Sequence, residues 1–117
     1  SDSHYGNGIE IIQQNHIQYG PYFRATSGCY KVTYYGSNLG DTCLIVDAYQ
    51  HRPGAYYGLR SFTRSNTTFS YYIQVPDLLY VKSDNGTGLE VHIDNGCTYD
   101  VQVSEILIEP VSSCPSS

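Results

Sequence analysis

The stretch that decides the fold is residues 88–110, which read GLEVHIDNGCTYDVQVSEILIEP. Apolar and polar side chains alternate on both sides of the turn Asp94-Asn95-Gly96. A period of two over this length predicts half-buried β-strands, because successive side chains of a strand point to opposite faces. Asn-Gly between two such segments is a hairpin signal, since both residues tolerate positive φ. We therefore expect strands at 89–93 and 99–109, joined as a hairpin.

The rest of the chain has the same character. No stretch shows the 3.6-residue period of a helix, and Gly, Asn and Pro interrupt the sequence at roughly ten-residue spacing. The further strands that we expect are 9–13, 22–25, 30–35, 44–49, 56–62, 68–75 and 78–82. Many short strands joined by turns predict an all-β fold, a two-sheet antiparallel β-sandwich of the jelly-roll type. It would be one domain over 1–117, with its first strand within 8–16 and a loose tail at 112–117.

Composition and charge exclude two kinds of partner. Six Lys and Arg stand against eleven Asp and Glu, for a net charge of −5. A chain of this charge is poorly suited to nucleic-acid phosphates or to an anionic membrane, so we expect neither partner. The aromatic residues include 13 Tyr and no Trp, a composition that suits polar recognition surfaces. No signal peptide is evident at the start, so we interpret the chain as a monomeric domain excised from a larger protein.

The four cysteines allow two disulfides in three connectivities. If the strand that begins at Cys29 runs antiparallel to the last strand, Cys29 lies near Cys114. Cys43 then lies near Cys97, and we prefer this pairing. The alternative is four reduced thiols that act as small apolar residues. No pair has the Cys-x-x-Cys spacing of a zinc site.

Three segments resemble a known family of domains. Residues 20–22 (GPY) and 27–34 (SGCYKVTY) resemble the G-x-Y-x-V-x-Y strand of bacterial β-sandwich carbohydrate-binding modules of the galactose-binding-like superfamily. Residues 69–76 (FSYYIQVP) are similar to the strand that precedes the closing hairpin of those modules, and residues 99–108 (YDVQVSEILI) are similar to their final strand. The resemblance implies a jelly roll that binds sugars. Those modules usually stack sugars on Trp, which this chain lacks, so here Tyr would take that role.

Outward positions of the expected strands form a first candidate surface. An aromatic ring stacks on the C–H face of a sugar and leaves the sugar hydroxyls free for hydrogen bonds. If 30–35, 44–49, 68–75 and 89–93 share one sheet, its wet face combines rings with charged hydrogen-bonding groups. The side chains of this face are Tyr35, Tyr49, Tyr72, Gln74, Lys31, Asp47, Glu90 and His92. The alternative is an ordinary solvated face with cross-strand Tyr pairs.

A second candidate is the segment 49–60, which reads YQHRPGAYYGLR. Loops at the end of a sandwich often carry recognition, and here Tyr56 and Tyr57 offer rings. Arg52 and Arg60 could grip a carboxylate or sulfate of an acidic sugar, because guanidinium is a planar bidentate donor. The alternative is a surface hairpin whose tyrosines cover the core.

The resemblance also implies a calcium ion. Jelly-roll modules of this kind often hold one structural Ca²⁺ between the first and last strands, through carboxylate and carbonyl oxygens. The alternation of the last strand slips at Ser104-Glu105, which predicts a bulge that re-aims side chains. The ligands that we expect are Glu10, Gln13, Asp100 and Glu105. The alternative for Glu105 is a carboxylate that faces solvent.

We expect no catalytic residues. The four histidines are scattered, and neither a nucleophile elbow nor a His-Glu-x-x-His motif is present. Glu90 and His92 share a face and are the alternative acid–base pair, but glycosidic cleavage needs a deeper cleft. We interpret the chain as a non-catalytic extracellular module that binds a polysaccharide or oligosaccharide by Tyr stacking and hydrogen bonds. The alternative is a structural or adhesion module that binds a protein or spaces other domains.

Overall fold

Ten β-strands occupy most of the chain in the computed structural model, which describes residues 3–5, 10–50, 54–76 and 87–116. In chain order they are β1 (Ser3–Tyr5), β2 (Glu10–Ile12), β3 (Ile17–Ala25), β4 (Gly28–Ser37), β5 (Leu44–Gln50), β6 (Ala55–Tyr56), β7 (Leu59–Arg64), β8 (Thr68–Val75), β9 (Thr87–Asn95) and β10 (Val101–Val111). The described residues contain no helix, which confirms the all-β class. Accordingly, none of them forms a helix that could cross a membrane.

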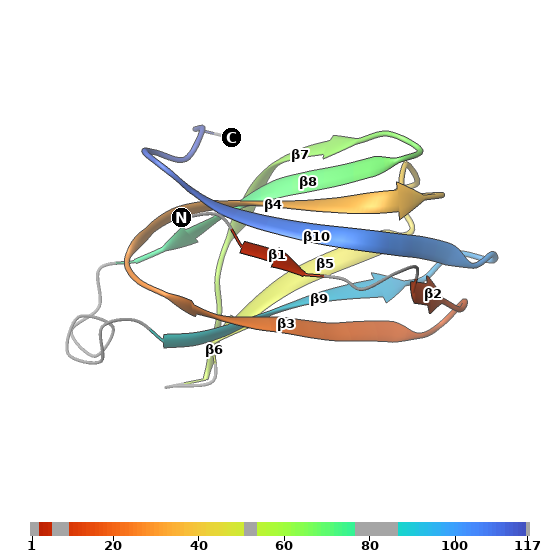
Figure 1. The fold of residues 1–117 in the computed structure, drawn as a ribbon, viewed down its shortest axis with the longest axis horizontal. Coiled ribbons are helices and arrows are strands. Elements are labelled where there is room, and N and C mark those ends of the chain that lie inside the picture. The colour runs from red at the N-terminus through yellow and green to blue at the C-terminus, as the bar shows by residue number, and fades with distance from the viewer. Residues whose placement is uncertain (1–2, 6–9, 51–53, 77–86, 117) are drawn as a thin grey trace.

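The strands form two antiparallel sheets that face each other as a sandwich (Figure 1). Within the described residues, the six-stranded sheet has the order β1-β10-β4-β8-β7, and β2 also pairs with β10. The four-stranded sheet has the order β3-β9-β5-β6. β1 and β2 pair with different halves of the same edge of β10, through Ile106–Ile108 and Val101–Val103 respectively. The two-sheet antiparallel sandwich is therefore confirmed.

The core lies between the sheets and is filled by alternate positions of each strand. From the six-stranded sheet the buried side chains include Val32, Tyr34, Phe69, Tyr71, Ile73, Ile106 and Ile108. From the four-stranded sheet they include Leu44, Ala48, Leu89, Val91 and Ile93. Burying each large apolar side chain stabilises the fold by about 1.5–3 kcal/mol. The same alternation turns the side chains between them, such as Glu90 and His92, away from the core.

The expected hairpin at Asp94-Asn95-Gly96 is wrong, because β9 and β10 lie in different sheets. Asn95 is fully buried and is used as a tether rather than as a turn residue. Its Nδ2 donates to the carbonyls of Ile12 (2.8 Å) and Tyr99 (2.9 Å), and its Oδ1 accepts from the Cys97 amide. These bonds direct the chain across the end of the sandwich, so the segment that follows β9 joins the opposite sheet.

Two other strand predictions need correction. The expected strand 56–62 is two strands in different sheets, because β6 pairs with β5 whereas β7 pairs with β8. The Tyr57 amide still bonds the Ala48 carbonyl at 3.0 Å, and the chain changes sheet directly after it. The strand expected at 22–25 is longer and begins at Ile17. The expected strand 78–82 lies outside the described residues.

Both disulfides of the preferred pairing are present. Cys29 is bonded to Cys114 and Cys43 to Cys97, with Cα atoms 5.3 Å and 5.0 Å apart. The premise of that prediction also holds, because β4 runs antiparallel to β10 with Cys29 opposite Val111. The first disulfide ties down part of the tail that begins at 112, as the preferred pairing implies. Two disulfides indicate an oxidising compartment.

Candidate functional site

The candidate surface expected from the sequence is divided between the two sheets. Asp47 and Tyr49 on β5 and Glu90 and His92 on β9 belong to the four-stranded sheet. Lys31 and Tyr35 on β4 and Tyr72 and Gln74 on β8 belong to the six-stranded sheet. The two sheets are the two layers of the sandwich (Figure 1). Because the core lies between them, strand alternation turns their outward side chains to opposite sides of the molecule. The eight residues therefore form two separate faces of four.

On the six-stranded sheet the ring of Tyr72 is covered by a neighbour. The Lys31 ammonium lies over the Tyr72 ring, 5.8 Å from its centroid. Tyr72 is half-buried, and Tyr35 is 36% exposed. The Gln74 amide donates to the Gly28 carbonyl at 3.4 Å. These contacts are cross-strand packing of the kind that stabilises a sheet.

On the four-stranded sheet, β3 adds two tyrosines that the sequence did not mark. Tyr19 pairs with His92 and Tyr22 pairs with Glu90, so two residues three apart on β3 oppose two residues that are two apart on β9. The extra residue is a bulge at Gly20-Pro21, where Gly20 has a φ of +93°. Without the extra residue, two side chains three positions apart would point to opposite faces of the sheet. The bulge puts both tyrosines on the outer face, where Tyr19 is 68% exposed and Tyr22 is 60% exposed. Pro is tolerated there because β3 is an edge strand.

His92 is the centre of this face. Its Nδ1 lies 2.6 Å from Oδ1 of Asp47 and its Nε2 lies 3.2 Å from Oε1 of Glu90. Tyr19 packs edge-on against the imidazole, with ring centroids 4.9 Å apart. The His92 Nε2 and Asp47 Oδ1 atoms are buried and form no aligned hydrogen bond, so what holds the two side chains together here is close packing. The imidazole is thus held in place from three sides by neighbours on β3, β5 and β9.

A second row of side chains runs across the sheet beside His92. Tyr22, Glu90 and Tyr49 are register partners on β3, β9 and β5, and Tyr49 in turn pairs with Tyr56 on β6. The rings of Tyr49 and Tyr56 lie 4.9 Å apart between centroids. Glu90 is buried, and its hydrogen bond with the Tyr22 hydroxyl raises the pKa of Tyr22 above 10.0. The row therefore joins a buried carboxylate to rings on both sides of it.

The loop expected as a second candidate contributes one ring to the same face. Tyr56 is 66% exposed and extends the row of Tyr49, so the loop and the face are continuous there. Tyr57 instead packs against the core. Arg60 lies on β7 of the other sheet, and its guanidinium donates to the Pro115 carbonyl at 3.2 Å, which helps to hold the tail. Arg52 lies outside the described residues.

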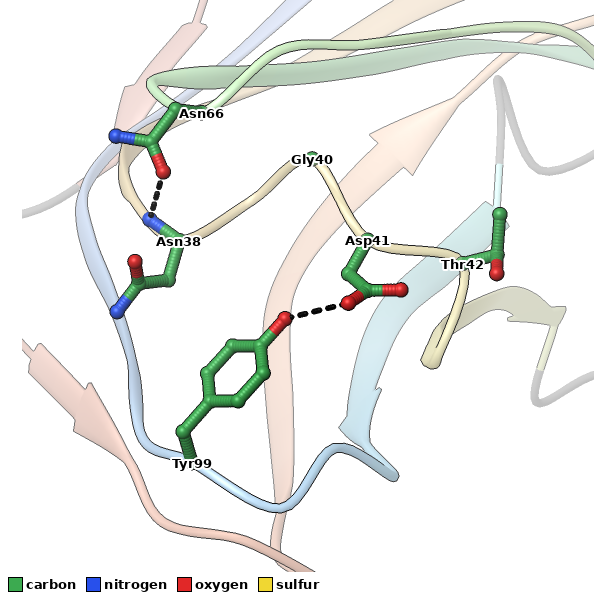
Figure 2. Close-up of a pocket in the computed structure, with 6 residues that line it drawn as sticks. All are labelled: Asn38, Gly40, Asp41, Thr42, Asn66 and Tyr99. Atoms are coloured by element: carbon green, nitrogen blue, oxygen red, sulfur yellow. Dashed lines mark hydrogen bonds between the residues drawn. The ribbon is translucent and has the colours of Figure 1, made fainter.

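A small cavity lies among the turns at one end of the sandwich, and none of its lining residues belongs to this face (Figure 2). Its volume is about 360 Å³, and it is lined by Asn38, Gly40, Asp41, Thr42, Asn66 and Tyr99. The Tyr99 hydroxyl donates to Oδ2 of Asp41 at 2.8 Å, and this hydrogen bond lowers the pKa of Asp41 below 3.8. No reasoning from the sequence marked this cavity, because its residues come from three separate turns.

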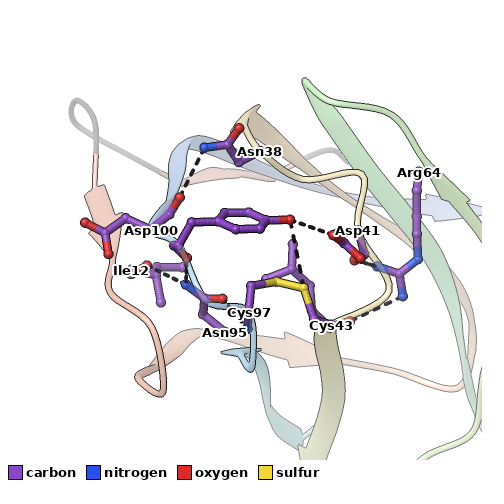
Figure 3. Close-up of a disulfide and its surroundings, with 10 residues drawn as sticks. Ile12, Asn38, Asp41, Cys43, Arg64, Asn95, Cys97 and Asp100 are labelled. Carbon is purple, nitrogen blue, oxygen red and sulfur yellow. Dashed lines mark hydrogen bonds between the residues drawn. A yellow bond between two sulfur atoms is a disulfide. The ribbon is translucent and has the colours of Figure 1, made fainter.

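The turns around the cavity are connected by a disulfide and by several hydrogen bonds. The Cys43–Cys97 disulfide is close to Tyr99, whose hydroxyl lies 4.0 Å from the Cys43 Sγ atom. Arg64 donates to the carbonyls of Asp41 (2.8 Å) and Leu44 (3.3 Å) (Figure 3). Asn38 donates from its side chain to the Asp100 carbonyl at 3.1 Å. Most polar groups here are therefore engaged in holding the three turns together.

The expected calcium ligands are spread along the edge of β10. The bulge predicted at Ser104-Glu105 is confirmed, because the register between β10 and β4 shifts between Val103 and Glu105. Glu10 lies opposite Val103 and bonds the Gln18 side chain, whereas Glu105 lies opposite Tyr35. Gln13 and Asp100 are exposed. Across the described ranges, no three His, Cys, Asp or Glu side chains form a group that could hold a metal ion.

Sequence comparisons do not assign the chain to a family. No protein-family model matches it, and no curated protein is similar to it in sequence.

Proposed function

We propose that this chain is a non-catalytic carbohydrate-binding module of the jelly-roll type, and that it binds a polysaccharide on the outer face of its four-stranded sheet. We call this surface the tyrosine face; it comprises Tyr19, Tyr22, Asp47, Tyr49, Tyr56, Glu90 and His92. The observation that carries the proposal is the exposure of Tyr19, Tyr22 and Tyr56, each at least 60% exposed, around polar groups that are held in place. Rings of this size are usually buried, and a group of exposed ones marks an interaction surface.

The arrangement matches what a sugar chain requires. Ring faces can stack on the C–H faces of sugars, while the carboxylates and the imidazole exchange hydrogen bonds with hydroxyl groups. The strands are spaced about 4.8 Å apart, so the row from Tyr22 to Tyr56 spans roughly 14 Å and suits an extended chain rather than one sugar. An open face leaves much of the ligand in water, so the affinity of a single site would be low. Such a module would act as part of a larger secreted or cell-surface protein.

The test is a glycan array on the isolated domain, with and without EDTA. The chain has no Trp, so Tyr fluorescence can then report directly on binding of a selected glycan in solution. We expect selective binding to one polysaccharide class and quenching of Tyr emission. A blank array with folded protein, in both the presence and the absence of added Ca²⁺, would contradict the proposal. Loss of binding in EDTA would support the proposed structural calcium ion, whose site stays a prediction.

A second candidate function is a protein-binding or adhesion module. It is favoured by Ile17 and Ile45, which flank Asp94 on the same face and are 41% and 62% exposed. Aliphatic side chains add to a protein interface but offer a sugar little. Ile45→Ser should therefore weaken a protein complex and leave glycan binding unchanged, which separates the two functions.

A further inference from the structure

The charges of the tyrosine face carry information about which sugars it can accept. Its described outward positions hold three carboxylates, those of Asp47, Glu90 and Asp94, and one guanidinium, that of Arg24. Arg24 is opposite Gly88 at one end of β3, whereas Asp94 is opposite Ile17 at the other. The end of the face that contains Asp47 and Asp94 is therefore acidic, with His92 as its one titratable nitrogen among the described residues.

The three carboxylates differ in what they offer a ligand. Glu90 is 95% buried in its side chain and is engaged by Tyr22 and His92, so it orients its neighbours instead of meeting solvent. Asp47 is the reverse, because 44% of its side chain is exposed although one oxygen lies against His92. Asp47 also stands in the row of Tyr19, so an exposed carboxylate and an exposed ring lie two strands apart on one surface.

A partly exposed carboxylate on a surface that also carries exposed aromatic rings can bind an ammonium group. The carboxylate accepts a charge-assisted hydrogen bond from it, and a ring face attracts the same cation through its quadrupole. A uronic-acid or sulfated sugar would instead bring a second negative charge to Asp47 and Asp94. We propose that the tyrosine face selects glycans that carry free amino groups, with Asp47 as the acceptor; this inference rests on the proposed carbohydrate-binding function.

The experiment compares three oligosaccharides of equal length by isothermal titration at a pH at which amino groups are protonated. They are a glucosamine oligosaccharide, its N-acetylated counterpart and an oligogalacturonate. We expect the amino form to bind at least about tenfold tighter than the acetylated form, a difference of about 1.4 kcal/mol. The acidic form should be the weakest, and added salt should reduce the amino preference because it screens an exposed charge.

The Asp47→Asn variant should bring the amino and acetylated forms to within about threefold of each other. Its matched control is Glu109→Gln, which removes one carboxylate from β10 on the opposite face and should leave the preference intact. If Asp47→Asn does not fold, as judged by its melting curve, Asp94→Asn is the substitute. It removes the other carboxylate from the acidic end of the tyrosine face and should also reduce the preference for the amino form. Equal binding of the amino and acetylated forms by the native protein, or a preference for the acidic form, would overturn the charge selection alone. If none of the three oligosaccharides binds and the glycan array is also blank, the carbohydrate-binding function itself would be overturned.

Discussion

The two outer faces of the sandwich both carry tyrosines at outward strand positions, yet they present them differently. On the six-stranded sheet the Lys31 ammonium lies over the ring of Tyr72, so the surface on which a sugar could stack is occupied. On the four-stranded sheet, Tyr22 is held at its hydroxyl by Glu90, and its ring remains exposed. The comparison teaches that the abundance of Tyr does not mark a binding surface. What matters is whether the cross-strand partner meets the ring at its face or at its edge.

The largest effect that we expect comes from the disulfides, which hold the two faces separately. Cys43–Cys97 joins the start of β5 to the segment after β9, whereas Cys29–Cys114 joins β4 to the tail after β10. For loops of 54 and 85 residues, loss of either bond should cost about 4 kcal/mol of unfolding free energy. Guanidinium unfolding of Cys43→Ala/Cys97→Ala and of Cys29→Ala/Cys114→Ala measures both costs.

Only the first pair lies at the end of the sheet that carries the tyrosine face. If both variants remain folded, glycan binding should weaken in Cys43→Ala/Cys97→Ala and persist in Cys29→Ala/Cys114→Ala. Equal loss of binding in both would show that the faces are coupled through the core and would break the comparison.

The second prediction compares the rings of the two faces directly. Tyr19→Ala/Tyr22→Ala removes two exposed rings, each worth about 0.5–1.5 kcal/mol if it stacks on a sugar. Affinity for the glycan selected on the array should therefore fall roughly 5- to 150-fold, measured by titration. The matched variant Tyr35→Ala/Tyr72→Ala on the six-stranded sheet should change the affinity less than about twofold. The opposite ranking would assign the site to the other face.

The strands and the two-sheet sandwich could be predicted because both depend on local alternation. The disulfide pairing followed from one assumption about strand direction, that the Cys29 strand runs antiparallel to the last strand, and this assumption holds. Leu89, Val91 and Ile93 are buried as their spacing predicts, and the bulge at Glu105 follows from a slip in the same pattern. The partner of a strand is a different matter. Asn95-Gly96 has the residues of a hairpin turn, but buried hydrogen bonds of Asn95 send the chain to the other sheet. A sequence pattern of a few residues cannot predict the distant hydrogen-bond partner of such a side chain, here the carbonyl of Ile12.

The same limit applies to the candidate site: the outward residues of each strand could be predicted, but not which strands share a sheet. Asp47, Tyr49, Glu90 and His92 were found from alternation and Tyr56 from the composition of the segment 49–60, and these five residues do gather on one face. The other half of that prediction assumed that four strands share a sheet, which they do not. Tyr19 and Tyr22 were missed because Gly-Pro between them reads as an interruption of the strand. Here it is the bulge that places both rings on the same side.

A third prediction uses tyrosines that face neither surface. Tyr34 and Tyr71 are fully buried in the core with their hydroxyls 3.5 Å apart, and burial raises the pKa of both above 10.0. Their protons are therefore held in the folded state and released on unfolding above about pH 10. Their contribution to stability is fully present below that pH. It should fall by about 1.4 kcal/mol per pH unit for each group as the pH rises further.

Guanidinium unfolding between about pH 9 and about pH 11 measures this slope. Tyr34→Phe/Tyr71→Phe removes both ionisable groups and should flatten the alkaline decline relative to the native chain. An unchanged decline in that variant would show that the loss of stability at alkaline pH arises from groups other than Tyr34 and Tyr71. The difference in ionisation between buried and exposed tyrosines would then not be measurable in this way.

The smallest effect tests how the tyrosine face holds its rings. Glu90→Gln removes the charged acceptor from Tyr22, so the pKa of Tyr22 should fall back toward 10.0 in an NMR titration of labelled tyrosines. Tyr99 is the internal control, because its pKa is raised by a hydrogen bond to Asp41 at the end of the sandwich and should stay raised. If the pKa of Tyr22 does not move, Glu90 does not hold the ring by its hydroxyl. The contrast between Tyr22, held at its hydroxyl, and Tyr72, covered on its ring face by Lys31, would then no longer explain why the two outer faces differ.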